Sequence, residues 1–334
     1  MAMKSYKGFD KKLKCRDFQY EIGKEYEMDG EIKVCSRGFH ACESPFDVFD
    51  YYTMIDSRFC EVEQDGNISK WDRGTKICSS KIKIKAELKL ADMINLGVEW
   101  LKEITSPEKI KTSIKDNSSG NNAQIGSSGY GAKIGSSGDG AQIGSSGNNA
   151  QIGSSGNNAK IGSSGDGAQI GSSGDGAQIG SSGNNAKIGS SGYGAKIGSS
   201  GYGAQIGSSG YDARIGSSGN NAKIGSSGYG AQIGSSGDGA QIGSSGDEAK
   251  ISSSGYGAKI DSTGEDCVIM CAGINSVAKA SKGSWVTLSE WSYSEEKQRY
   301  IPICVKTEFV DGEKIKADTY YSLKGGVFVE WIND

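Results

Sequence analysis

The residues that could carry out chemistry gather in one stretch near the N-terminus. The single histidine lies within Cys35-Ser-Arg-Gly-Phe-His40-Ala-Cys42, and Cys15 lies upstream. Cysteine sulfur and imidazole nitrogen are the ligands that Zn²⁺ prefers, so Cys15, Cys35, His40 and Cys42 form a four-ligand candidate set. Their spacing matches no common ligand pairing, and a buried histidine beside free thiols is the more ordinary outcome. We therefore predict no metal site and no cofactor.

The single histidine also limits the enzyme classes that fit this chain. A Ser-His-Asp triad would need His40 as its base, and no Gly-x-Ser-x-Gly elbow accompanies it. The many Gly-Ser-Ser-Gly segments lack the Lys-Ser/Thr pair that a phosphate-binding loop places at the start of a helix. We therefore expect a protein without catalytic residues.

The elements that hold these residues belong to the first of three expected regions, residues 1–118, which we predict to be an α+β domain. Alternating apolar residues predict strands, and a 3.6-residue period predicts a helix. We expect a strand pair at Phe18–Glu21 and Tyr26–Met28, further strands at Ile32–Cys35 and Lys81–Ala86, a short helix at Asp47–Tyr52, and a helix at Ala91–Ile104 that caps the next region.

The second region, residues 119–263, is a nine-residue repeat. The unit Gly-Tyr-Gly-Ala-Lys-Ile-Gly-Ser-Ser recurs in sixteen copies without insertion from Gly120 to Thr263. A flexible linker has no reason to keep an Ile at every ninth position, so this register predicts a solenoid. Within each copy Ala, Ile and the first Ser alternate with polar residues, which predicts a short strand with those three side chains inward.

Each copy also has two variable corner residues between its first Gly and its Ala. The second one is Gly or Asn, except at Asp212 and Glu248, which predicts a left-handed backbone conformation at this corner position. One strand and one corner per copy predict a flattened β-solenoid coil of two copies, about 18 residues. Eight such coils, about 4.8 Å apart, would stack over about 38 Å and be held by inter-coil hydrogen bonds and ladders of Ile and Ser.

The first corner residue varies among Tyr, Asp and Asn. With two copies in each coil, Tyr193, Tyr211 and Tyr229 fall on one edge in successive coils, while Tyr202 falls on the opposite edge. Exposed aromatic ladders favour protein contacts, so we predict these four tyrosines to bind a partner. The alternative is that Tyr, Asp and Asn are interchangeable corner residues.

Charge and composition argue against several other functions of the repeat. Eight basic and eight acidic residues balance in residues 120–263, so we expect no direct binding of nucleic acid. The calcium-binding nonapeptide needs an Asp in every unit, and ice binding needs an outward Thr array, and neither is present. The N-terminus lacks the apolar core of a signal peptide, and no long apolar run occurs, so we expect a cytoplasmic protein with no membrane association and reduced cysteines.

The third region, residues 264–334, is expected to be a degenerate capping coil followed by a small β-rich domain. Larger apolar residues replace Ala and Ile at Cys267–Cys271. We predict strands at Trp285–Leu288, Ile301–Val305 and Val327–Trp331, with tight turns at Asp311-Gly312 and Gly325-Gly326. The fold class is therefore mainly β.

The flanking regions also carry a resemblance. Tyr6-Lys-Gly-Phe-Asp10, Leu13-Lys-Cys-Arg-Asp-Phe-Gln-Tyr-Glu21 and Gly38-Phe-His-Ala-Cys42, followed by Phe49-Asp-Tyr-Tyr52, resemble a family of phage- and prophage-encoded proteins. Its members continue into Ser-Gly-Tyr-Gly-Ala and Ser-Gly-Asp-Gly-Ala arrays and end in sequences similar to Ile301–Lys306 and Asp311–Asp318. The family has no established activity, so the resemblance implies a phage setting and no mechanism.

Three functional hypotheses follow from these features. The first is a non-catalytic inhibitor that occludes a host defence complex, such as a CRISPR effector or another nucleic-acid-guided complex, with the rigid solenoid. The second is a structural spacer of the virion or the host surface. The third makes the N-terminal region a nucleotide-binding or transferase module with the repeat as its scaffold.

Overall fold

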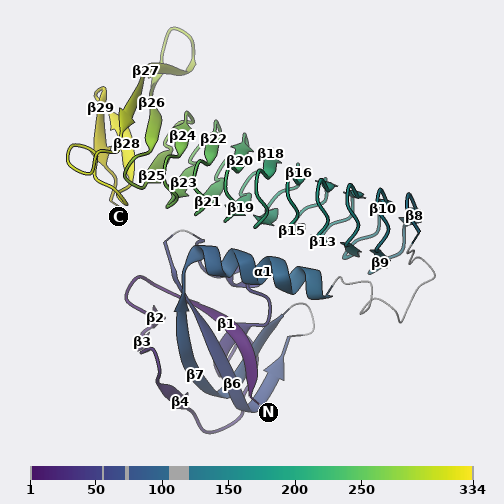
Figure 1. The fold of residues 1–334 in the computed structure, drawn as a ribbon. Coiled ribbons are helices and arrows are strands. Elements are labelled where there is room, and N and C mark those ends of the chain that lie inside the picture. Colours follow the sequence, from purple (N-terminus) through teal and green to yellow (C-terminus); the bar gives the residue numbers. More distant parts are fainter. Residues whose placement is uncertain (1, 55, 72–74, 105–119, 333–334) are drawn as a thin grey trace. The chain divides into compact units, whose positions relative to one another are not determined.

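A computed structural model describes residues 2–54, 56–71, 75–104 and 120–332 (Figure 1). The chain divides into two compact units, Met1–Trp100 and Leu101–Asp334. Strands account for most of the regular structure in both units, and β8 to β25 repeat with the nine-residue period. The mainly β fold with a central β-solenoid is confirmed.

The N-terminal unit is built around a small closed sheet. Its strand order is β4-β7-β5-β1-β6, and β6 also pairs with β7, which closes a ring of four strands. The elements of this unit are β1 (Met3–Phe9), β2 (Lys14–Cys15), β3 (Phe18–Gln19), β4 (Glu25–Glu27), β5 (Phe39–Cys42), a 3₁₀ helix η1 (Phe46–Asp50), β6 (Arg58–Lys70), β7 (Lys76–Leu88) and α1 (Leu90–Ile104).

Apolar side chains fill the ring, and α1 presents an apolar face as its period predicted. Phe9, Val62, Ile82 and Ile84 are each fully buried in the interior. In α1, Gly97 lies so close to the ring of Phe46 that a Cβ there would overlap it. Residues 105–119 lie outside the described residues, so the capping role expected for this helix stays a prediction.

One predicted N-terminal strand and one predicted strand pairing are wrong. Phe18–Glu21 does not pair with Tyr26–Met28, because β3 pairs with β2 while β4 pairs with β7. Ile32–Cys35 is a turn with a single bridge between Lys33 and Arg37, and Cys35 has φ of 64° there. The predicted strand Lys81–Ala86 is confirmed as part of the longer strand β7, but the local apolar pattern did not reveal that β7 is the partner of β4.

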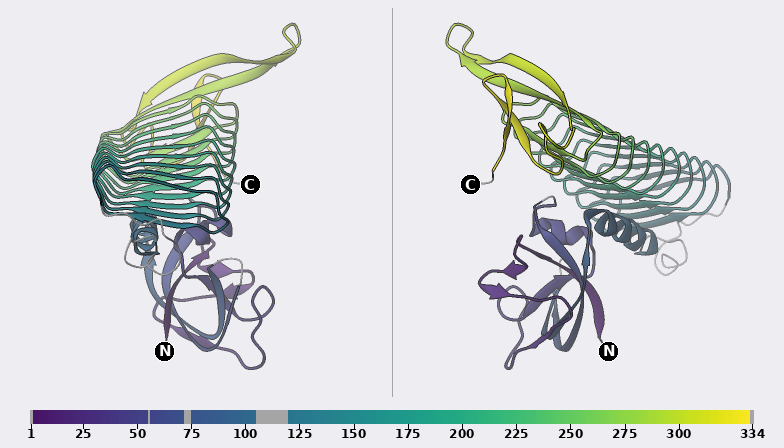
Figure 2. Two further views of the ribbon diagram at one scale, coloured as in Figure 1. Left: turned by 90° about the vertical axis from the view of Figure 1, so that its right-hand side faces the viewer. Right: turned by 60° about the vertical axis from the view of Figure 1, so that its left-hand side comes forward.

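The repeat forms two parallel sheets that face each other across the solenoid (Figure 2). Each strand pairs in register with the strand 18 residues later, as Ile143 does with Ile161. One sheet contains β8 (Gln124–Ser127), β10 (Gln142–Ser145), β12 (Lys160–Ser163), β14 (Gln178–Ser181), β16 (Lys196–Ser199), β18 (Arg214–Ser217), β20 (Gln232–Ser235), β22 (Lys250–Ser253) and β24 (Val268–Cys271).

The opposite sheet contains the strands of the alternate copies. These are β9 (Lys133–Ser136), β11 (Gln151–Ser154), β13 (Gln169–Ser172), β15 (Lys187–Ser190), β17 (Gln205–Ser208), β19 (Lys223–Ser226), β21 (Gln241–Ser244), β23 (Lys259–Ser262) and β25 (Val277–Ala280). The two-copy coil is therefore confirmed, and the stack runs on beyond the sixteenth copy to give about nine turns.

From the second copy onward the Ala, the Ile and the first Ser are buried, as predicted, whereas in the first copy they are partly buried. Ala195 and Ile188, for example, are 0% exposed. The serine ladders contribute less than expected, because hydroxyls such as those of Ser190 and Ser208 have no hydrogen-bond partner among the described atoms. The main-chain bonds between coils and the burial of Ala and Ile therefore hold the stack together.

The second corner residue has the predicted left-handed conformation at every corner from Asn122 to Asn275. Its φ lies near 55° where it is Asn, Asp or Glu and near 65° where it is Gly, and Asp212 and Glu248 conform. Its main-chain N–H donates to the first corner carbonyl of the next coil, as from Asn149 to Asp166 at 2.7 Å. The corner conformation thus supplies one hydrogen bond per coil on each edge.

Two antiparallel hairpins end the two sheets. β26 (Trp285–Ser294) continues the first sheet beside β24 and then pairs with β27 (Arg299–Phe309). β28 (Tyr321–Lys324) pairs antiparallel with β25 and with β29 (Val327–Glu330), through a turn in which Gly325 and Gly326 both have positive φ. Figure 1 shows the β26–β27 hairpin projecting beyond the stack.

Within the described part of the chain, no helix combines the length and the apolar composition needed to cross a membrane.

Candidate binding surfaces

The two edges of the solenoid are held by their corner side chains. We number the copies from 1 (120–128) to 16 (255–263) and call the corners of the odd-numbered copies the odd edge and those of the even-numbered copies the even edge. Where the first corner residue is Asn or Asp, its Oδ1 accepts the N–H of the residue 18 positions later, as Asp175 does from Tyr193 at 2.8 Å. Asn and Asp are therefore interchangeable at this position because both side chains provide this Oδ1 acceptor.

Tyrosine at the first corner position follows a different rule. Its hydroxyl bonds to the side chain 19 positions later, which is the second corner residue of the next coil. On the even edge the hydroxyls of Tyr130, Tyr202 and Tyr256 accept hydrogen bonds of 2.7–2.9 Å from Asn149, Asn221 and Asn275.

On the odd edge the acceptors are carboxylates. Tyr193 donates to Asp212 and Tyr229 donates to Glu248, and these hydrogen bonds raise the pKa of both phenols. Tyr211 faces Gly230 instead, and its ring packs edge-on against Tyr229 with centroids 6.4 Å apart. The bonded tyrosines are thus fixed in position while remaining exposed.

The odd edge is therefore both aromatic and acidic. Tyr193, Tyr211 and Tyr229 lie on it in three successive coils and are 57%, 62% and 43% exposed. Around them the odd edge carries the exposed carboxylates of Asp175, Asp212, Asp247, Glu248, Glu265 and Asp266. The even edge has only Asp238 over the same coils. The acidic residues therefore gather on the odd edge, although the total charge of the repeat is balanced.

The odd edge leads directly into the outer face of the sheet that contains β8 to β24. A groove of about 1460 Å³ runs along this face over a floor of glycines, including Gly162 and Gly198, with Lys160, Lys196 and Arg214 beside it. Towards the C-terminus the face becomes apolar, with Val268, Met270, Trp285, Ile303, Val305 and Phe309 all at least 41% exposed. Exposed apolar groups of this size are typical of protein contact surfaces.

His40 in the N-terminal unit is half-buried and neutral. Its Nε2 accepts the main-chain N–H of Cys35 at 2.9 Å. Burial, and to a smaller extent the positive charges of Lys76, Lys7 and Arg16, lower the pKa of the imidazole to about 4. A histidine in this environment is a hydrogen-bond acceptor and not a base near neutral pH.

The structure does not assemble the four candidate zinc ligands. Cys35 contributes its main chain to His40, while burial raises the pKa of the Cys42 thiol to about 12. The Sγ of Cys15 faces the Tyr52 hydroxyl at 3.0 Å and the Lys7 ammonium at 3.6 Å. No cluster of three or more His, Cys, Asp or Glu side chains that could hold a metal occurs in the described ranges.

These residues line a pocket of about 1030 Å³ that lies within the N-terminal unit. Its walls include Lys7, Arg16 and Lys76, which the sequence reasoning did not single out. The alternation of Ser5, Lys7 and Phe9 on β1 was the available signal, since it places the lysine on the side of the strand that carries Phe9.

Residues 3–96 match the model of a family described as a domain of unknown function, DUF7666. The DUF7666 match covers the closed sheet, the pocket and the start of α1, and it includes none of the repeats. Comparison with curated proteins and with solved structures found no match.

Proposed function

We propose that this protein is a non-catalytic binding protein that inhibits a host defence complex by steric occlusion, with the odd edge of the solenoid as its contact surface. The observation that carries the proposal is the group formed by Tyr193, Tyr211 and Tyr229, exposed in successive coils. Rigid aromatic side chains contribute much contact area at a small entropic cost, and two of these are already held by Asp212 and Glu248.

The charge of the edge indicates the chemistry of the partner. Carboxylates on both corner positions surround the tyrosines, so the complementary surface is basic. A nucleic-acid-guided defence complex has such a surface where it holds its nucleic acid. A solenoid seated there would keep the nucleic acid out without any chemistry, and the phage setting implied by the resemblance agrees with such a target.

The test replaces the three tyrosines with asparagine, which already occupies the same corner position in other copies, such as Asn184 and Asn220. The tagged full chain is used to capture proteins from host lysate, and the captured proteins are identified by mass spectrometry. We expect a defence complex to be recovered with the parent chain, to be lost with the Y193N/Y211N/Y229N variant, and to dissociate at raised ionic strength.

The matched control is Y130N/Y202N/Y256N, which makes the same three changes on the even edge. We expect this control to bind like the parent chain, although it replaces Tyr202, which the sequence analysis also named as a contact residue. Equal binding by both triple variants would contradict the odd edge as the contact surface. Recovery of phage tail proteins alone would favour the spacer hypothesis instead.

A further inference from the structure

Partner binding by the solenoid does not account for the pocket of the N-terminal unit. It lies where β1, the β2–β3 hairpin, β5 and the segment after η1 come together. All of its lining residues belong to the region between Tyr6 and Lys76. Its size is in the range of small-molecule sites.

One of the residues that line this pocket is a buried lysine. Lys7 is 4% exposed, and its Nζ donates to the carbonyl oxygen of His40 at 2.8 Å. The same amine lies over the rings of Phe9 and Tyr20, at 5.4 and 5.6 Å from their centroids. Among the described residues no carboxylate pairs with Lys7, and burial lowers the pKa of its amine. An anion entering the pocket would supply the missing counter-charge.

Two further cations share this region. Arg16 and Lys76 line the pocket, and their charges act with that of Lys7 on the His40 imidazole. The acidic residues of the lining, Asp17, Glu25 and Glu27, are all exposed. Lys7 is therefore the buried positive charge of the pocket, Lys76 is half-buried, and Arg16 is exposed like the three carboxylates.

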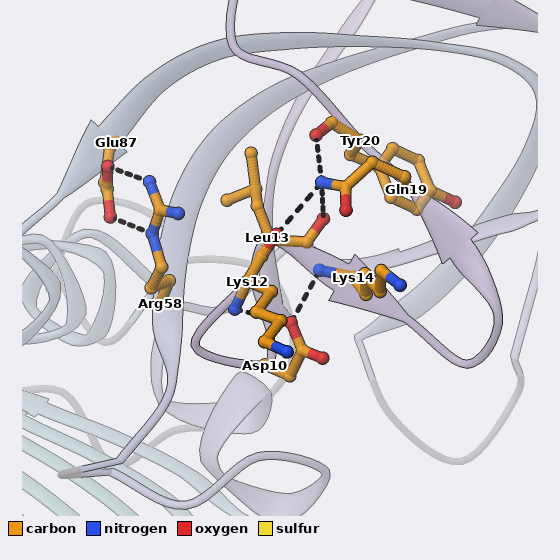
Figure 3. Close-up of polar contacts among 8 residues, drawn as sticks. All are labelled: Asp10, Lys12, Leu13, Lys14, Gln19, Tyr20, Arg58 and Glu87. Carbon is orange, nitrogen blue, oxygen red and sulfur yellow. Dashed lines mark hydrogen bonds and ion pairs between the residues drawn. The ribbon is translucent and has the colours of Figure 1, made fainter.

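Arg16 is held in a conformation that favours glycine. Its φ is 55°, in the two-residue turn between β2 and β3. The preceding loop is braced, because Asp10 Oδ1 accepts the N–H groups of Lys12 and Lys14 at 2.8 and 2.7 Å (Figure 3). The carboxamide of Gln19 also donates to the carbonyl of Tyr20 at 2.9 Å (Figure 3). Backbone strain at a pocket is a recurrent feature of functional sites.

The pocket also offers aromatic surface to a ligand. Phe18 and Tyr51 are lining residues with 47% and 46% of their surface exposed. The Lys76 ammonium lies 4.3 Å from the centroid of the Tyr51 ring, so an aromatic face and a positive charge occur side by side. A planar ring carrying an anionic group matches this pairing.

From this arrangement we propose that the pocket binds a small ligand of the nucleotide class. The phosphate would lie among Lys7, Arg16 and Lys76, and the base would lie against Phe18 or Tyr51. The proposal concerns binding alone and includes no bond-breaking step. It is independent of the odd edge, so it can fail or succeed without affecting the proposed inhibitory function.

The test is isothermal titration calorimetry on the full chain with the four common ribonucleoside monophosphates, adenosine and inorganic phosphate, each up to about 1 mM. We expect at least one nucleotide to bind about tenfold or more tightly than either adenosine or phosphate. If phosphate binds as tightly as every nucleotide, the aromatic rings do not contribute to binding. If adenosine binds as tightly as AMP, the cations do not contribute. If none of these compounds binds, the pocket is not a nucleotide site.

Two variants distinguish loss of ligand binding from loss of folding. Arg16→Gly removes a cation and relieves the positive φ, so the variant should melt no lower than the parent and bind about tenfold more weakly. Lys7→Met keeps the stem while removing a buried charge, and we expect the same pair of results. Lys11→Met, on an exposed lysine outside the pocket, is the matched control and should bind like the parent. Unchanged affinity in both pocket variants would refute the proposal.

Discussion

At the scale of single residues, the repeat contains two kinds of glycine that mutation can distinguish. The glycine that opens each corner, such as Gly201, lies against the main chain of the coil before it, and a Cβ there would overlap the carbonyl oxygen of Gly183. The strand glycine Gly198, three residues earlier, has nothing within 4 Å of the position that a Cβ would occupy.

We therefore expect Gly201→Ala to lower the free energy of unfolding by about 2–3 kcal/mol, because the main chain of the neighbouring coil cannot retreat without loss of inter-coil hydrogen bonds. Gly198→Ala should change it by less than about 0.5 kcal/mol. Urea unfolding followed by circular dichroism measures both. Equal midpoints for the two variants would show that the corner is not tightly packed.

A second residue-scale prediction concerns pH. The pKa of His40 is held near 4 in the folded chain, below its ordinary value of 6.5, mainly by burial and then by the nearby Lys76, Lys7 and Arg16. Between these two values the unfolded chain binds a proton that the folded chain does not, so stability rises with pH across this window and falls as the solution is acidified.

His40→Gln retains an acceptor for the Cys35 N–H and does not titrate. The parent should therefore lose about 1 kcal/mol more stability than this variant between pH 7 and pH 5, after allowance for solvent screening of a half-exposed group. Denaturant titrations at the two pH values measure the difference. The same loss in both proteins would mean that His40 is not responsible.

At the scale of elements, the C-terminal hairpins close a stack that would otherwise end in open edges. β26 covers β24 and β28 covers β25, and each is followed by an antiparallel partner. A bare parallel edge is a template for further pairing with another chain.

We expect a chain that ends at Ala280 to self-associate, because both sheets would then end in unpaired strands. Size-exclusion chromatography with light scattering should give a larger and more heterogeneous mass than for the full chain. A deletion of residues 174–191, which removes one whole internal coil, is the control and should leave the association state unchanged. A truncated chain with the association state of the full chain would argue against a capping role.

The elements that the sequence predicted best are those fixed by local chemistry. Ile188 and its equivalents mark strands because they recur every nine residues, and the corner residues mark turns because few residue types tolerate positive φ. The pairing of the N-terminal strands was predicted less well, since β4 pairs with β7 far along the chain, while β3 pairs with the adjacent strand β2. The pocket was missed because a lysine within a strand is normally exposed, and the alternation of Lys7 with Ser5 and Phe9 was the only sign of its burial.

At the scale of the whole chain, the two-copy coil allows the length of the solenoid and the rotation of its C-terminal part to be changed independently by deletion. Removing residues 174–191 shortens the stack by one coil, whereas removing residues 183–191 turns everything after the deletion by half a coil relative to the first copies. Neither deletion touches Tyr193, Tyr211 or Tyr229.

We expect both deletions to fold and to bind the partner, because the proposed contact surface lies beyond both of them. Circular dichroism and capture of the partner by the tagged variants measure the two properties. Loss of binding with the nine-residue deletion alone would show that the partner contacts copies on both sides of the cut.

The packing of the second corner residues on one another also limits how duplication can change the number of coils in the repeat. The Oδ1 of Asn149 occupies the space above Gly167 where a Cβ would lie, as does that of Asn221 at Gly239. If one coil with Asn at this corner were duplicated in register, two Asn side chains would stack at the same corner of successive coils. Duplication of two coils would keep Asn and Gly alternating there. We therefore expect the inherited length variants of this array to differ by 36 residues more readily than by 18.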